Sequence, residues 1–300
     1  MAKKRRRKYR VKPRFFIIIA VLLIAMILFV KLVISVVGGL MEKESTPSVT
    51  PNNLVIAIDS GHDSQADKGA VAPGGINEFM LNDAVCKALK EELLNRGYTV
   101  IETRKLGSSE QKSLNERVRI LNESWPDLLI SIHHNANEDA SVKGFTIIYN
   151  DKKTDAYDGQ YVKYNSGVYK MIKEENGRLF YQDGTKEKSF DLEKNASKFQ
   201  IFDLTSVGLV AESKAVADNL YASMSTLEFV KPLSEKKENT VINQNLQILR
   251  QAHVVGVMVE CGFMTNEAEL EQLNNADNQK ATAKAIADGI DAYFKAKEKI

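Results

Sequence analysis

VIAIDSGHDS, residues 55–64, is an apolar run that turns polar at Asp59 and then reaches a histidine, His62. Its first four residues are typical of a buried strand. In open α/β sheets, binding sites form just beyond the carboxyl ends of the strands, so residues that directly follow a strand are candidates for function. A single histidine after a strand is more often structural than catalytic. His62 nevertheless stands out, because the chain contains only four histidines.

Strand and helix patterns alternate on the C-terminal side of this run. Residues 79–96 carry apolar side chains at helical spacing and are followed by Gly97, which is typical of a helix C-terminus. The order of elements and the wholly apolar strands predict an α/β fold, a mostly parallel open sheet with helices on both faces. The other expected strands are residues 98–102, 128–132, 144–149 and 254–260, and the other expected helices are residues 113–123, 209–224, 244–250 and 278–297.

Residues 151–205 interrupt this alternation with a polar stretch rich in Lys, Asp and Tyr. The runs YVKY, GVYKMI and RLFYQDG are separated by Asn, Gly and Asp, a pattern that predicts short strands in hairpins. We expect an inserted small β-rich element. Two interpretations stay open: a folded accessory element with a substrate-specificity or regulatory role, and a loosely ordered decoration without a role in turnover.

The N-terminus has the pattern of a membrane anchor. Residues 1–14 hold nine Lys and Arg and no acid, and residues 15–40 are apolar apart from Lys31. This predicts a basic cytoplasmic tail (1–14), an N-terminal transmembrane helix (15–40) and an extracytoplasmic remainder. The linker, residues 41–53, spans at most about 45 Å when extended. A single-pass protein of the cell membrane is therefore expected.

Two alternatives compete with a membrane anchor at this N-terminus. A cleaved signal peptide has a shorter apolar run, about 7–15 residues, and a clear cleavage site, which is not evident here. A basic arm that binds nucleic acid is the second alternative. Beside a hydrophobic span, membrane topology is the simpler explanation of the positive charge, and we expect no nucleic-acid partner.

Polar residues follow three of the expected strands: His62 after the first, His133 with His134 and Asn135 after the third, and Glu260 at the end of the last. A catalytic zinc site needs three protein ligands of N or O type and an open position. His62 and His133 can supply two of them. Glu78, at the start of a helix, can supply the third or can merely complement the helix dipole, and spacing alone does not decide.

Five segments carry a family resemblance: IAIDSGHDSQADKGAVAPGGINE, ETR, LNERVRILN, SIHHNA and VECGFMTN. In order and spacing they are similar to the zinc-dependent N-acetylmuramoyl-L-alanine amidases of the amidase-3 family. The resemblance runs from residue 54 to the C-terminus, apart from the insertion. It implies a catalytic domain over residues 54–300 that hydrolyses the amide bond between N-acetylmuramic acid and L-alanine in peptidoglycan.

Carried over by residue, the resemblance implies that His62, Glu78 and His133 bind Zn²⁺ and that Glu260 is the catalytic carboxylate. His134 stands where the family usually has a small residue, so three roles stay open for it: support of the metal ligands, substrate binding, or metal binding in place of His133. Asn135 is a further candidate for substrate binding. Residues of the shared motifs that lie below the strand ends are interpreted as structural ion pairs, namely Arg104, Glu116 and Arg117.

The expected partners are peptidoglycan, the membrane and a protein activator. An anchor with a short linker suits a Gram-positive enzyme of cell separation or spore cortex remodelling, and both roles stay open. The alternative function is a catalytically silent, membrane-tethered module that binds peptidoglycan or regulates other wall enzymes. Retention of both histidines, Glu78 and Glu260 favours catalysis, because a pure binding module has no need of a base.

Overall fold

The computed structural model describes residue 31, residues 50–154 and residues 159–300. The chain divides into two units, Met1–Val49 and Thr50–Ile300, and all of the described residues except residue 31 belong to the second. The predicted cytoplasmic tail and nearly all of the predicted transmembrane helix lie outside the described residues. Among the residues that are described, no helix has the length and apolar character needed to cross a bilayer.

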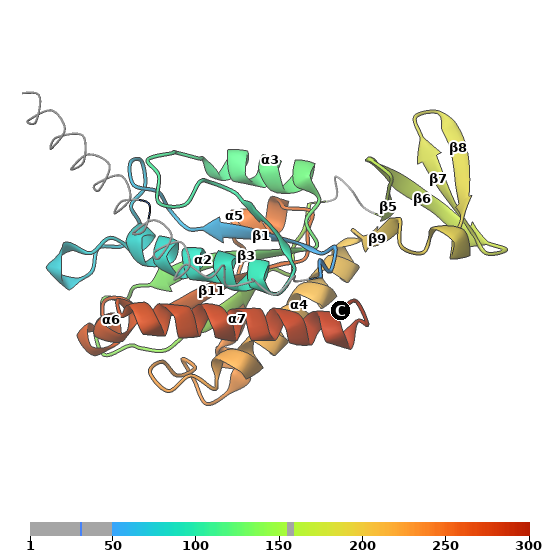
Figure 1. The fold of residues 1–300 in the computed structure, drawn as a ribbon. Coiled ribbons are helices and arrows are strands. Elements are labelled where there is room, and N and C mark those ends of the chain that lie inside the picture. Colours follow the sequence, from blue (N-terminus) through green and yellow to red (C-terminus); the bar gives the residue numbers. More distant parts are fainter. Residues whose placement is uncertain (1–30, 32–49, 155–158) are drawn as a thin grey trace, which may run out of the picture. The chain divides into compact units, whose positions relative to one another are not determined.

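A six-stranded sheet forms the centre of the second unit (Figure 1), with the strand order β10-β4-β11-β3-β1-β2. Strands β2, β1, β3 and β11 are parallel to one another, whereas β4 is antiparallel to β11 and pairs in parallel with β10. The predicted α/β class with a mostly parallel sheet is therefore confirmed. The strands are β1 (Val55–Ser60), β2 (Thr99–Glu102), β3 (Leu128–Asn135), β4 (Thr146–Tyr149), β10 (Val241–Asn243) and β11 (Gly256–Phe263).

Helices cover both faces of this sheet. One face packs against α2 (Glu78–Asn95), α4 (Ser206–Met224) and α7 (Ala276–Ala296), and the other against α3 (Leu114–Ser124) and α5 (Gln247–Gln251). Side chains of β3 alternate between the two faces of the sheet. Ile130 therefore packs in the apolar cluster under α2, α4 and α7, and Leu129 in the one under α3 and α5. The last short helix, α6 (Glu267–Leu273), follows β11.

The strands continue further than their apolar segments predict. β3 extends to Asn135 and β11 to Phe263, so His133 lies within its strand instead of beyond it, and Glu260 lies inside its strand instead of at the end. The two residues are in register with each other. The expected strand ends were too early because backbone pairing with a neighbouring strand continues where the side chains become polar. β10 was not expected at all, since three residues give no periodicity.

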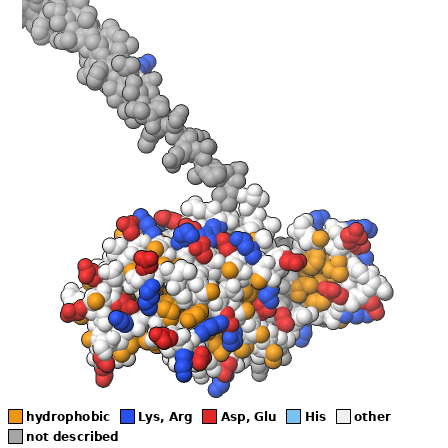
Figure 2. Space-filling model, turned by 90° about the horizontal axis from the view of Figure 1, so that it is seen from below, with side chains coloured by type: hydrophobic (Ala, Val, Ile, Leu, Met, Phe, Trp, Pro, Cys, Tyr) orange, Lys and Arg blue, Asp and Glu red, His pale blue; other side chains and the backbone are white. Residues whose placement is uncertain are grey.

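The inserted element is folded. Its five antiparallel strands form a separate small sheet with the order β8-β7-β6-β5-β9. They enclose a cluster of their own in which Val162, Leu179, Tyr181 and Phe190 are buried, while further hydrophobic side chains reach the surface of this lobe (Figure 2). The strands are β5 (Gln160–Tyr164), β6 (Gly167–Glu175), β7 (Arg178–Asp183), β8 (Lys186–Asp191) and β9 (Phe199–Asp203), and a three-residue 3-10 helix, Glu193–Asn195, precedes β9. Two further 3-10 helices, Pro73–Gly75 and Lys237–Asn239, lie outside the insertion.

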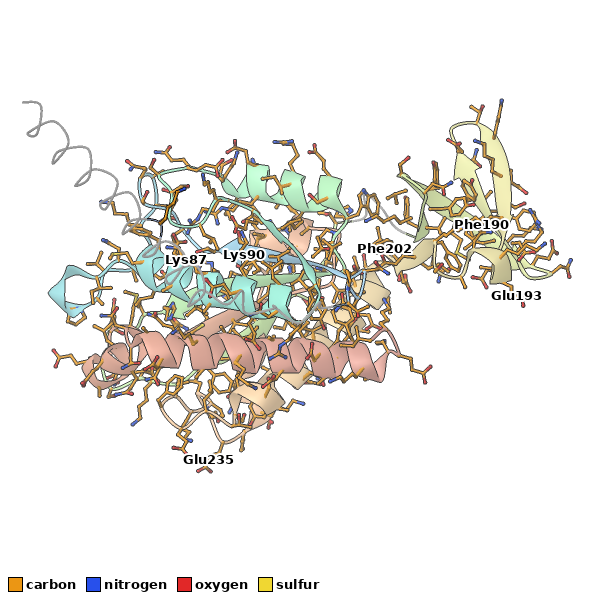
Figure 3. The ribbon with its side chains drawn as sticks, viewed as in Figure 1. Lys87, Lys90, Phe190, Glu193, Phe202 and Glu235 are labelled. Atoms are coloured by element: carbon orange, nitrogen blue, oxygen red, sulfur yellow. The ribbon has the colours of Figure 1, made fainter. Side chains whose placement is uncertain are left out.

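The small sheet contacts the amino-terminal edge of the large sheet. The ring of Trp125, just before β3, lies 5.8 Å from that of Tyr161 and 6.1 Å from that of Phe202. Gln200 donates a hydrogen bond to Asp127. Figure 3 shows Phe202 on the side of the small sheet that is nearer to the large one and Phe190 inside the small sheet. The insertion therefore attaches at the opposite end of β3 from His133.

A buried ion pair fixes the carboxyl end of β1. Asp59 is 2% exposed, lies 2.9 Å from the Arg117 guanidinium and accepts hydrogen bonds from Thr103 and Ser131. Burial acts to raise the pKa of Asp59. The charge of Arg117 and the hydrogen bonds from Thr103, Ser131 and Arg117 outweigh this effect and hold the pKa below the usual 3.8. Ionised Asp59 therefore stabilises the fold above about pH 4, and this contribution is lost as the pH falls through the lowered pKa.

Asp59→Asn is expected to lower the free energy of unfolding by about 3–5 kcal/mol at pH 7, because Arg117 is left buried without a counter-charge. The deficit relative to the parent should narrow below about pH 4, where Asp59 itself becomes protonated. Urea denaturation at several pH values measures both effects. Glu91→Gln, a change on the exposed side of α2, is the matched control. A deficit that does not depend on pH would contradict this account.

Candidate metal centre

Two buried guanidinium groups hold the turn that follows β1. Arg104 Nε donates to the carbonyls of Ser60 at 3.1 Å and His62 at 2.7 Å. Arg117 donates to the same two carbonyls, both at 2.6 Å. His62 has a φ of 61°, the left-handed conformation that non-glycine residues rarely adopt. The four hydrogen bonds keep His62 in this conformation and so set the direction of its side chain.

The same arginines make ion pairs, as predicted. Arg104 lies 2.6 Å from Asp83 and Arg117 lies 2.9 Å from Asp59. The prediction for Glu116 was wrong. Its carboxylate accepts from the backbone N–H of Ser113 at 2.9 Å, and Ser113 accepts from the backbone of Glu116, so the two residues form a capping box that begins α3.

Glu78 lies between two histidines. Its Oε2 is 3.1 Å from His62 Nε2 and its Oε1 is 2.9 Å from His133 Nδ1. One potential ligand atom from each of the three residues falls within 4.8 Å of the others. The tertiary structure thus brings together His62, Glu78 and His133, which we call the metal triad, from the turn after β1, the first turn of α2 and the end of β3.

The charges of the metal triad suit a cation. Burial acts to lower the pKa of His62, but Glu78 and then Asp67 outweigh it and raise the pKa to about 9. Burial acts to raise the pKa of Glu78, but hydrogen bonds and charge from His133 and His62 hold it well below its usual range. Glu78 therefore attracts positive charge to a position that a proton or a metal ion can fill.

The carboxylate of Glu78 is itself held in place. It accepts from the backbone N–H of Ala70 at 3.0 Å, from Asn82 Nδ2 at 3.2 Å and from the backbone N–H of His134 at 3.3 Å. Asn82 Oδ1 in turn lies 2.7 Å from His134 Nδ1. Asn82, one helical turn beyond Glu78, was missed from the sequence. The spacing of four residues on one helix is the signal that could have found it.

His134 occupies a different place from the one expected of a substrate-binding residue. It is 2% exposed and points to the face of α2, opposite His133. Burial lowers the pKa of its imidazole to about 3, so the ring is neutral at physiological pH. Its contact with Asn82 favours support of Glu78 among its predicted roles, and substrate binding by His134 stays a prediction. Asn135, next along β3, is half-buried and stays a prediction for substrate binding.

Glu260 lies beside the metal triad on β11. It is in register with His133, so both side chains point to the face covered by α3 and α5. Burial raises the pKa of Glu260 to about 7, His133 and His62 act to lower it, and Glu78 acts to raise it. A carboxyl group with this pKa can both accept and release a proton near neutral pH.

A groove of about 440 Å³ opens beside His62 and His133 on this face. Its walls come from the turn after β1, the start of α3, α5 and β11, including Lys112, Leu114 and Met258. A groove that combines apolar side chains with polar and charged groups beside the metal triad is typical of a substrate site. Gly61 allows the approach of His133, because a Cβ added to Gly61 would lie 2.3 Å from the imidazole ring.

Comparison with known proteins agrees with this geometry. Residues 56–292 match the Amidase_3 family model, described as N-acetylmuramoyl-L-alanine amidase. The chain is 29% identical over 244 residues to a putative N-acetylmuramoyl-L-alanine amidase of Buchnera aphidicola, covering 80% of this chain and 94% of the relative. It is 24% identical over 240 residues to AmiA of Escherichia coli, covering 80% and 76%.

Among solved structures, the fold is similar to that of the CwlD amidase from Clostridioides difficile in complex with the GerS lipoprotein. The TM-score is 0.56 at 20% identity, covering 81% of this chain and 100% of that one. The family-model match over residues 56–292 confirms the expected family and its activity, hydrolysis of the bond between N-acetylmuramic acid and L-alanine. The chain belongs to the Amidase_3 family of N-acetylmuramoyl-L-alanine amidases.

Proposed function

We propose that this amidase is zinc-dependent, with Zn²⁺ held by His62, Glu78 and His133 and with Glu260 as the catalytic carboxylate. The observation that carries the proposal is the closeness of the three ligand atoms, within 4.8 Å of one another, beside a half-buried carboxyl group. Two imidazole nitrogens and one carboxylate oxygen are a donor set typical of catalytic zinc. When bound, zinc supplies an acidified water and polarises the amide carbonyl.

The remaining chemistry falls to residues of the chain. An amide is a poor electrophile and its nitrogen a poor leaving group, so the reaction needs both a base and an acid. Glu260 takes the proton from the attacking water and passes it to the leaving nitrogen. Its pKa of about 7 suits both steps at neutral pH. Asn82 and the backbone of Ala70 keep Glu78 oriented toward the cation.

We also propose that residues 15–40 anchor the enzyme in the cell membrane and that residues 1–14 remain in the cytoplasm. The nine basic residues before the apolar stretch support this orientation. The catalytic domain then lies outside the membrane, where peptidoglycan is found, as suits a Gram-positive cell. A protein activator is a further proposal, supported by the similar CwlD structure that contains the GerS lipoprotein.

Glu260→Gln is expected to lower kcat for peptidoglycan by at least about 100-fold, because the amide side chain cannot take a proton. Zinc content, measured by atomic emission on residues 41–300, should stay at the parent level. His62→Ala is the matched comparison and should lose both zinc and cleavage. In the parent enzyme, a chelator should abolish cleavage and added Zn²⁺ should restore it. Full activity of Glu260→Gln would reject Glu260 as the base.

Asn82→Ala is expected to weaken zinc binding by about 10–100-fold, because Glu78 loses a hydrogen-bond donor that orients its carboxylate. Competition with a zinc chelator of known affinity measures the effect. Asn219→Ala on α4, where the amide bonds only to the backbone of its own helix, controls for the loss of an asparagine from a helix. Equal zinc affinity of the Asn82 variant and the parent would contradict the supporting role of Asn82.

A further inference from the structure

Thr146 lies opposite Glu260 in the large sheet. β4 and β11 are antiparallel, and Thr146 pairs with Glu260 in their register, as His133 does on the other side of β11. Their side chains therefore share the face covered by α3 and α5. Three polar side chains form a row across three strands at this level: His133, Glu260 and Thr146.

The hydroxyl of Thr146 carries an uncompensated energetic cost. Thr146 is 1% exposed, and its Oγ1 has no hydrogen-bond partner among the described residues. Glu260 Oε2, a buried atom of the opposite side chain, likewise has none within the part of the chain that the structure describes. Leaving a buried hydroxyl unpaired costs about 1–3 kcal/mol. Valine has nearly the same shape without that cost, and the two residues that follow Thr146 on β4 are both isoleucines.

The two unpaired groups are within reach of each other. Residues directly opposite in an antiparallel pair have Cβ atoms about 4.5–5.5 Å apart. The threonine hydroxyl is attached to its Cβ, and the glutamate carboxylate is attached through one further methylene group. Rotation about the side-chain bonds of Glu260 is therefore enough to form an O–H···O bond of ordinary length, with no movement of the backbone.

We propose that Thr146 is a positioning residue for Glu260: its hydroxyl donates a hydrogen bond to one carboxylate oxygen and leaves the other oxygen free to take the proton from water. This inference rests on the proposed role of Glu260. It explains a polar residue in an otherwise apolar strand. It also gives β4, which brings no ligand to the metal triad, a part in the reaction.

Thr146→Val is expected to lower kcat for peptidoglycan by about 10-fold, the effect of losing one hydrogen bond to a charged group. KM and zinc content should not change. The thermal unfolding midpoint should change little, because valine keeps the shape of threonine at this buried position and leaves no hydroxyl without a partner. Thr146→Ser, which keeps the hydroxyl, should recover most of kcat. Thr282→Val, a buried position on α7, controls for the loss of a threonine hydroxyl in the core.

The outcomes separate this inference from the proposed function. Parent-level kcat in Thr146→Val, with Glu260→Gln inactive, would overturn the role of Thr146 and leave Glu260 as the base. A Thr146→Ser variant as slow as Thr146→Val would overturn it too, since the hydroxyl would then not be the group that matters. An active Glu260→Gln variant would reject the proposed function first, whatever Thr146 does.

Discussion

The turn after β1 depends on two buried arginines, and the metal triad depends on that turn. Arg104 and Arg117 each donate to the carbonyls of Ser60 and His62, and both guanidinium groups also pair with a buried carboxylate. A surface ion pair contributes little, but a buried charge that loses its partner is strongly destabilising. The turn after β1 therefore tolerates little movement. This rigidity keeps His62 at its positive φ.

Electrostatics then divides the acidic groups of the site into two roles. Glu78 lies between two imidazoles and stays ionised, whereas the half-buried Glu260 has fewer compensating contacts and a pKa of about 7. In the proposed mechanism the first carboxylate holds the cation and the second exchanges a proton. The two carboxyl groups differ in pKa because hydrogen-bond donors surround Glu78, whereas the main effect on Glu260 is desolvation by burial.

The insertion is structurally independent of this chemistry. Its five strands enclose their own cluster of aromatic and aliphatic side chains, and it contacts Trp125 and Asp127 at the amino-terminal edge of the large sheet. The metal triad lies at the carboxyl edge. Because the length of the strands separates the two, the small sheet contributes no side chain to the triad. Its aromatic residues serve first as the core that makes an element of this size stable.

Sequence patterns predicted the α/β class and the insertion, and the family motifs named the three residues that the tertiary structure brings together as the metal triad. Apolar strands, helical spacing and family motifs are local properties of the sequence, so they can be recognised without knowing how the chain packs. The tertiary structure decided which way each side chain points. His134 points to the face of the sheet opposite that of His133, and Glu116 caps its own helix. Thr146 lies opposite Glu260 on the neighbouring strand, although the two residues are 114 positions apart in the sequence. Strand register and the direction of alternate residues arise only when strands pair, so no local pattern in the chain contains them.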